Sequence, residues 1–126
     1  MKRPKFTQAL ADTLLACNHV NLVSPHGRGR RQTLLDLETL LGDVVVRKID
    51  LKREQDTWKN WLDDTLSLNG QVIVIIHNIE YLEEKCRYTL KPLSLSRNRS
   101  ILCVLEHEDN ALNQQAEYLE LPMKTD

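Results

Sequence analysis

Residues 72–76 (VIVII) restrict the fold of this chain more than any other segment. All five residues are β-branched, and the run lacks the apolar–polar alternation of a strand with one side in solvent. Such a strand must be covered on both faces, as happens inside a parallel sheet that has helices on each side. The run therefore predicts a central strand of an α/β sheet.

The rest of the chain alternates between helical and strand patterns, without a linker, repeat or low-complexity segment. Helical spacing of apolar residues predicts helices over residues 7–16, 31–41, 54–66 and 82–90, with Gly42 as the stop of the second. Apolar runs predict strands over residues 19–23, 44–51, 71–77, 101–105 and 118–121. We expect one domain over residues 1–126: a doubly wound, mostly parallel five-stranded sheet with helices on both faces, in three α/β/α layers.

Composition narrows the classes of protein to consider. No apolar run approaches the roughly 20 residues that span a bilayer, and no signal-peptide core follows the basic N-terminus, so we expect a cytoplasmic protein without a membrane role. The net charge is only −1, but it is polarised: residues 1–48 carry eight basic and four acidic residues, and residues 49–126 carry nine and fourteen. The three cysteines are widely separated, which predicts reduced, mostly buried thiols.

A turn rich in glycine and arginine, residues 24–31 (SPHGRGRR), joins the first predicted strand to the next helix. A phosphate loop reads G-x-x-x-x-G-K-[ST], with backbone N–H groups around the phosphates, a lysine on the terminal phosphates and a hydroxyl on magnesium. Ser24, Gly29, Arg30 and Arg31 hold the four defined positions. Cations at a helix N-terminus favour a bound anion, although the glycines by themselves could serve only the turn. The candidate phosphate- and nucleotide-binding residues are Gly27, Arg28, Gly29, Arg30, Arg31 and Gln32.

Loop and element order together resemble the core of a P-loop ATPase of the AAA+ or related STAND type, over nearly the whole chain. In those families a later hydrophobic strand ends in an acidic residue that organises magnesium, and many AAA+ members follow it with a glutamate that activates water. Here His77 and Asn78 stand at those two places, and Glu80 is the acidic residue left nearby. The chain also reaches Asp126 without room for the helical lid that AAA+ relatives usually carry.

The replaced residues predict binding without efficient hydrolysis. Phosphoryl transfer relies on magnesium and a positioned water. Arg31 cannot ligate magnesium, and an imidazole at position 77 favours softer metals. Arg30 can still grip a phosphate, because guanidinium is permanently charged and forks onto its oxygens. We expect weak binding of ATP or ADP at most, without Mg²⁺ and without a resident metal.

The leading interpretation is therefore a pseudo-ATPase that acts as a regulatory or assembly module, binding a protein partner or a copy of itself. One alternative is a slow ATPase in which Arg30 replaces the lysine and Glu80 the acidic strand-end residue. Another is a DNA-binding accessory protein of a mobile-element or defence system, with the arginines on nucleic-acid phosphates.

Several other residues invite a functional hypothesis. Trp58 and Trp61 lie at helical spacing, which favours the core over stacking on bases. Arg97 and Arg99 precede the fourth predicted strand and are candidates for arginines that act in trans on a neighbouring subunit. Three histidines near strand ends could meet at the carboxyl edge of the sheet, but their spacing matches no pair of metal ligands; they are His19, His77 and His107.

Overall fold

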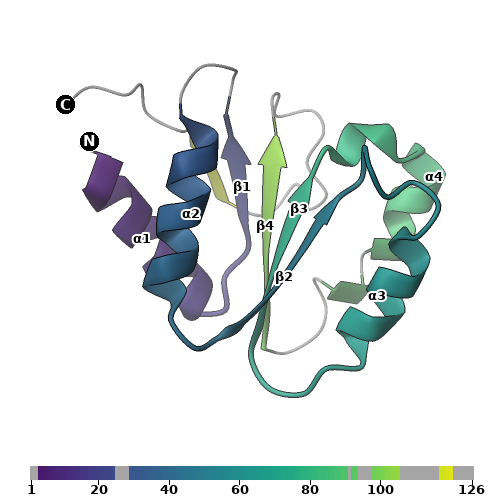
Figure 1. Cartoon of the computed structure of the whole chain (residues 1–126), viewed down its shortest axis with the longest axis horizontal. Helices are drawn as coiled ribbons and strands as arrows, with labels where there is room; N and C mark the ends of the chain where they lie inside the picture. Colours follow the sequence, from purple (N-terminus) through teal and green to yellow (C-terminus); the bar gives the residue numbers. More distant parts are fainter. Residues whose placement is uncertain (1–2, 25–28, 91, 94–97, 106–116, 121–126) are drawn as a thin grey trace.

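The computed structural model of the chain describes residues 3–24, 29–90, 92–93, 98–105 and 117–120 (Figure 1). Its helices and strands, in chain order, are α1 (Arg3–Leu15), β1 (Val20–Val23), α2 (Arg30–Leu41), β2 (Val45–Asp50), α3 (Trp58–Leu66), β3 (Val72–His77), the 3₁₀ turn η1 (Ile79–Tyr81), α4 (Glu84–Arg87), the 3₁₀ turn η2 (Tyr88–Leu90), β4 (Arg99–Leu105) and β5 (Glu117–Glu120). None of the helices among these residues is long and apolar enough to cross a membrane.

The strands form a parallel sheet in the order β2-β3-β4-β1-β5. The predicted parallel α/β class is confirmed, and β3 is an interior strand, as the run of β-branched residues requires. The middle position, however, belongs to β4, which separates β3 from β1. All seven residues of β4 are buried, so this strand is as well suited to the interior as β3.

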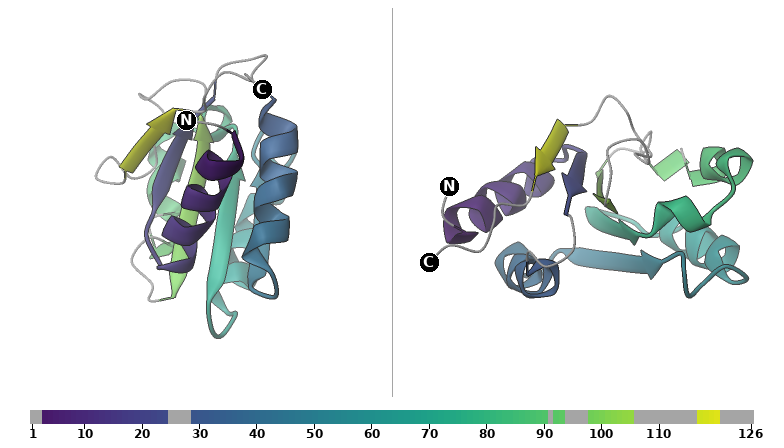
Figure 2. Two further views of the ribbon diagram at one scale, coloured as in Figure 1. Left: turned by 90° about the vertical axis from the view of Figure 1, so that its left-hand side faces the viewer. Right: turned by 90° about the horizontal axis from the view of Figure 1, so that it is seen from above.

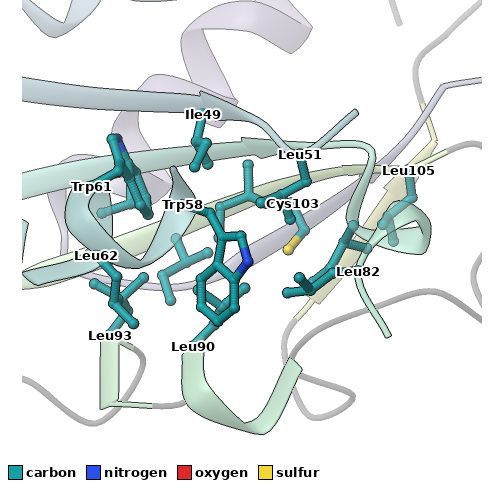
Figure 3. Close-up of a cluster of buried hydrophobic side chains, with 14 of the residues drawn as sticks. Ile49, Leu51, Trp58, Trp61, Leu62, Leu82, Leu90, Leu93, Cys103 and Leu105 are labelled. Atoms are coloured by element: carbon teal, nitrogen blue, oxygen red, sulfur yellow. The ribbon is translucent and has the colours of Figure 1, made fainter. Parts of the chain in front are cut away.

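Helices cover both faces of the sheet, as Figure 2 shows. Alternate residues of β3 pack into different cores: Ile73 and Ile75 join the cluster built with α1 and α2, whereas Val74 and Ile76 join the one built with α3. This division explains why every position of the strand is apolar. The second cluster contains Trp58 (Figure 3), and both predicted core tryptophans are buried there.

The predicted helix boundaries need three corrections. Helix α1 begins at Arg3 instead of residue 7. Helix α3 begins at Trp58 instead of residue 54, because the preceding residues form turns in which the N–H groups of Arg53 and Glu54 both donate to the carbonyl of Asp50. The helix predicted over residues 82–90 is broken into α4 and η2, and Leu82 itself is extended. Its side chain is buried in the α3 cluster, so tertiary burial outweighs helical propensity there.

Two smaller expectations have different outcomes. Gly42 ends α2 with φ 66° and ψ −129°, a positive-φ conformation that glycine adopts readily. The three cysteines are free, but only Cys103 is buried; Cys86 is half-buried and Cys17 is exposed. Cys86 packs against the α3 cluster that contains Cys103, so two of the three thiols belong to the core; Cys17 lies in the turn after α1 with φ 65° and not on its apolar face.

Candidate functional site

The carboxyl ends of the parallel strands meet at one edge of the sheet, which is where open α/β folds bind ligands. Asp50 and His77 are the last residues of β2 and β3 and pair in the register. Ser24 extends β1 by one residue, since its N–H donates to the carbonyl of Leu105 over 2.7 Å. We call Ser24, Asp50, His77 and the first turn of α2 the carboxyl rim.

The three strand-end side chains share one face of the sheet. Side chains alternate between faces along a strand. His77 has the parity of Ile75, and Ser24 has that of Leu22; Ile75 and Leu22 both pack in the cluster with α1 and α2. Asp50, the neighbour of His77 in the parallel register, faces the same way. The rim therefore opens on the side where α2 begins.

The start of α2 is built around Gly29, which adopts the left-handed conformation with φ 73° as the N-cap. The N–H and the hydroxyl of Thr33 both donate to the Gly29 carbonyl, each over 3.2 Å. Arg30 is half-buried and Arg31 is exposed in the first turn. The positive end of the helix dipole and two arginines thus lie at the same end of α2.

The predicted phosphate-binding residues divide into two groups. Gly27 and Arg28 lie outside the described residues. The other four begin α2, as expected, but Gln32 has its amide engaged, because it donates to the carboxylate of Asp36 over 2.8 Å along the helix. They are Gly29, Arg30, Arg31 and Gln32.

Arg30 and His77 act on each other across the rim. Burial lowers the pKa of His77 below its ordinary value, and the positive charge of Arg30 lowers it further. The carboxylates of Asp50 and Glu38 oppose this shift, and Lys48 adds to it. The net direction leaves His77 an uncharged imidazole at neutral pH. The loop arginine therefore lies within electrostatic range of the histidine at the end of β3.

Asp50 is the rim residue that the sequence analysis missed. Its Oδ1 accepts hydrogen bonds from the side-chain amide of Asn78 over 2.6 Å and from the Lys52 N–H over 3.0 Å, and its Oδ2 lies 3.7 Å from Nε of Arg53. An acidic residue directly after the apolar run of β2 was the available signal. Its relation to Asn78 could not be read from the sequence, because 28 residues separate the two.

Two polar atoms beside the rim are buried without a hydrogen bond from any described residue. One is the hydroxyl of Ser24, whose side chain has no exposed surface; the other is Oε2 of Glu80 in η1. Buried polar groups are nearly always paired in folded proteins. A group that formed a hydrogen bond with either atom would therefore be stabilising.

The structure overturns two expectations at the opposite, amino edge. Arg99 is 7% exposed, and its guanidinium donates to the carbonyls of Leu68 and of Gly70, the latter over 2.7 Å. It is occupied within the fold and is not available to act in trans; Arg97 lies outside the described residues. His19 precedes β1, where its Nδ1 accepts from the Ile101 N–H over 3.1 Å, so it does not meet His77. His107 lies beyond the described part.

The same architecture occurs in a solved ATPase structure. The structure is similar to that of RuvB from Thermotoga maritima, solved as a P216G mutant, with a TM-score of 0.62 and 14% sequence identity over 95% of this chain. The chain therefore shares the fold of this part of RuvB, a parallel α/β sheet with helices on both faces. The match spans 44% of the RuvB chain, and at this identity it establishes the fold alone. No protein-family model and no curated protein matches the sequence.

The resemblance to P-loop ATPases implies magnesium with the nucleotide, but the rim does not fit this ion. Mg²⁺ requires oxygen ligands in an octahedral arrangement. At the two motif positions that ligate or organise magnesium, the rim offers Arg31 and the imidazole of His77, and the carboxylate of Asp50 is engaged by Asn78 and Lys52. Among the described residues, no group of three His, Cys, Asp or Glu side chains is placed to hold a metal ion.

Proposed function

We propose that this chain is a catalytically degenerate P-loop ATPase-like domain that serves as a regulatory or assembly module. It binds a protein partner or another copy of itself, holds nucleotide weakly at most, and does not hydrolyse ATP efficiently. The RuvB-like fold supports the P-loop ATPase-like architecture, and the composition of the rim supports the loss of catalysis.

The observation that carries this proposal is that Arg30, at the start of α2, lies within electrostatic range of His77 at the end of β3. Catalysis by this kind of site needs a metal-bound phosphate and an acidic group at the end of β3. The chain instead places a half-buried imidazole there, within electrostatic reach of a guanidinium. The hydroxyl position of the loop holds Arg31, and neither its guanidinium nor the imidazole of His77 can supply an oxygen ligand to magnesium, so both magnesium positions are lost.

Exposed apolar side chains support a protein-binding role. Leu35 and Leu40 on α2 and Val45 on the edge strand β2 are 51%, 40% and 47% exposed. Large apolar side chains at the surface are common singly, but a helix and the neighbouring edge strand both carry them here. A partner that covered α2 and β2 would remove this apolar area from water.

Steady-state ATP turnover tests the loss of catalysis. Purified wild-type protein and an Arg30→Ala variant should both show only background turnover with magnesium. A variant with three motif residues restored, Arg30→Lys/Arg31→Thr/His77→Asp, should gain a magnesium-dependent rise in melting temperature with ATP, because ligands that prefer the folded state stabilise it. Turnover by the wild type that Arg30→Ala abolishes would establish the alternative, a slow ATPase.

Nucleic-acid binding is the second candidate, and the arrangement of Arg30 and Arg31 at the start of α2 favours it. Both arginines lie at a helix N-terminus, and Arg31 is exposed to solvent. Phosphate contacts by such side chains make affinity fall steeply with salt. DNA affinity that is lost in an Arg30→Ala/Arg31→Ala variant and weakens with salt would support this role, and absence of binding at low salt would remove it.

A further inference from the structure

We propose that the outer edge of β2 binds an extended acidic segment of another protein, which adds to the sheet as a further strand and places a carboxylate on Arg47. This inference rests on the proposed function, since it concerns the partner of an assembly module. It goes further by naming the residues that select the partner and the pattern of residues that the partner must carry.

The outer edge of β2 carries main-chain groups that are free to pair. Among the described strands, β2 is at the end of the sheet and pairs with β3 alone (Figure 1). The Leu51 N–H donates to the His77 carbonyl over 3.0 Å, so the residues in step with Leu51 direct their main chain toward β3. Val46 and Lys48 alternate with these residues and direct theirs outward, where no described segment bonds to them. Such an edge is a template for another strand.

The two faces of β2 differ in charge. Ile49 packs in the α3 cluster and Val46 against the cluster with α1 and α2, so the odd-numbered residues of β2 share the α3 face. On the α2 face, Lys48 is already paired with Glu38 at 3.0 Å. On the α3 face, Arg47 forms no ion pair with any residue that the structure describes. A strand added here would therefore meet an unneutralised cation on the α3 face.

The guanidinium of Arg47 is held in one place by α3. Its Nε donates to the buried hydroxyl of Thr65 over 3.2 Å, and its Cζ lies 6.0 Å from the centre of the Trp61 ring. These contacts leave its two terminal nitrogens without an acceptor in the described part of the chain. A carboxylate that bound them would meet a side chain that is already ordered, so little further conformational entropy would be lost.

Two neighbours of Arg47 would also gain from a partner. Trp61 is 9% exposed, and its indole N–H is buried without an acceptor from the described residues. Val45, two residues before Arg47 on the same face, is 47% exposed. Buried donors are nearly always paired in folded proteins, and covering an exposed valine removes apolar area from water. The α3 face of β2 thus presents unpaired donors beside an apolar side chain.

These features specify the partner. On an added strand, the residue opposite Arg47 should be Asp or Glu, and the residue two positions away, beside Val45, should be apolar, because cross-strand neighbours share a face. A second copy that added its own β2 antiparallel about a two-fold axis would bring only Val45, Arg47 and Ile49 to this face. None of these three is acidic. We therefore assign the edge to a different, acidic segment.

Peptide titrations followed by amide NMR spectra of the full chain test the inference. The probe is the acetylated and amidated peptide TVTETVT, whose symmetric pattern presents the same face in either strand direction, and TVTKTVT is its charge-reversed counterpart. Wild-type protein should bind TVTETVT about tenfold more tightly than TVTKTVT, with the largest changes at the amides of Val46 and Lys48. TVTETVT with N-methyl groups on its three central residues should bind about tenfold more weakly, because it cannot donate to the strand.

Substitutions on the two faces of β2 identify the charge that selects the peptide. Arg47→Gln should lose about tenfold in affinity for TVTETVT, and Arg47→Glu should reverse the preference between the two peptides. Lys48→Gln is the matched control, because it removes the same charge from the next residue on the opposite face. Its affinity for TVTETVT should stay within about twofold of the wild type. Circular dichroism confirms that each variant is folded.

Equal affinity for the two charged peptides, equal losses in Arg47→Gln and Lys48→Gln, or no spectral change at millimolar peptide would overturn the inference. Analytical ultracentrifugation gives a further test. A wild-type dimer that Arg47→Gln dissociates would also overturn it, because a second copy would then occupy the edge, although the proposed assembly role would stand. These outcomes do not depend on ATP turnover through Arg30, which is the result that would remove the proposed function.

Discussion

The side-chain amide of Asn78 donates to the carboxylate of Asp50 over 2.6 Å, and this hydrogen bond joins the carboxyl ends of β3 and β2. Burial by itself raises the pKa of Asp50, but the bonds from Asn78 and from the Lys52 N–H, with the charges of His77 and Arg53, hold it below its ordinary value. Asn78 also adopts the left-handed conformation, with φ 60°. One residue thus supplies both a turn and a cross-strand bond.

Replacing Asn78 should separate these two contributions. Asn78→Ala should lower the free energy of unfolding by about 2–3 kcal/mol, because it loses a hydrogen bond to a charged group and because alanine adopts the left-handed region less readily than asparagine. Asn78→Gly should cost about 1 kcal/mol less, since glycine adopts this conformation freely. Urea denaturation of both variants measures the difference. Equal losses would show that the backbone conformation contributes nothing.

The stability of the domain should fall as the pH drops from about 7.5 toward 5.5. His77 has a lowered pKa in the folded protein, so the unfolded chain binds more protons in this window, and protonation favours unfolding. The stabilisation is fully present above the unfolded pKa and is lost as the pH falls toward the folded one. The slope from this one group is at most about 1.4 kcal/mol per pH unit.

A His77→Gln variant provides the control for this pH dependence. Denaturation curves collected across the same pH range should show a shallower decline for the variant than for the wild type, because glutamine does not titrate. If the two profiles run parallel, His77 is not responsible for the change.

Arg99 should prove to be a structural residue. Arg99→Ala removes a buried guanidinium that donates to the carbonyls of Leu68 and Gly70, and it should reduce the free energy of unfolding by about 3 kcal/mol. The matched control is Arg53→Ala, whose side chain is 85% exposed and should cost less than about 1 kcal/mol. Similar midpoints for the two variants in urea would return Arg99 to the candidates for a trans-acting arginine.

Trp58 should act as a core residue and not as a platform for bases. Trp58→Ala should cost about 3–5 kcal/mol, because it empties a large buried site in the α3 cluster. Tyr81→Ala is the comparison, since Tyr81 is 46% exposed and its ring faces Lys52; it should cost less than about 1 kcal/mol. Thermal or urea denaturation distinguishes them. An unchanged stability of Trp58→Ala would contradict the assignment to the core.

Local sequence patterns were enough for most of the fold. The β-branched residues of β3 can be accommodated only with both faces covered, and the spacing of Trp58, Trp61 and Leu62 suits one buried helical face. Such patterns reflect the structural preferences of residues that are close together in the sequence. They did not place the start of α3, because the N–H groups of Arg53 and Glu54 bond to the Asp50 carbonyl in turns before it. They also did not give the short length of α4, because the burial of Leu82 competes with helical propensity.

The sequence by itself determined the order of helices and strands, the parallel α/β class, and the arginines at the start of α2. Only the tertiary structure decided that β4 enters between β1 and β3, that Asp50 lies against Asn78, that Arg99 is buried and that His19 lies at the edge opposite His77. The physical reason is that strand order and side-chain pairing come from contacts between distant segments. The order of elements, the parallel class and the arginines at the start of α2 follow from periodicity and backbone preference, which act over a few residues.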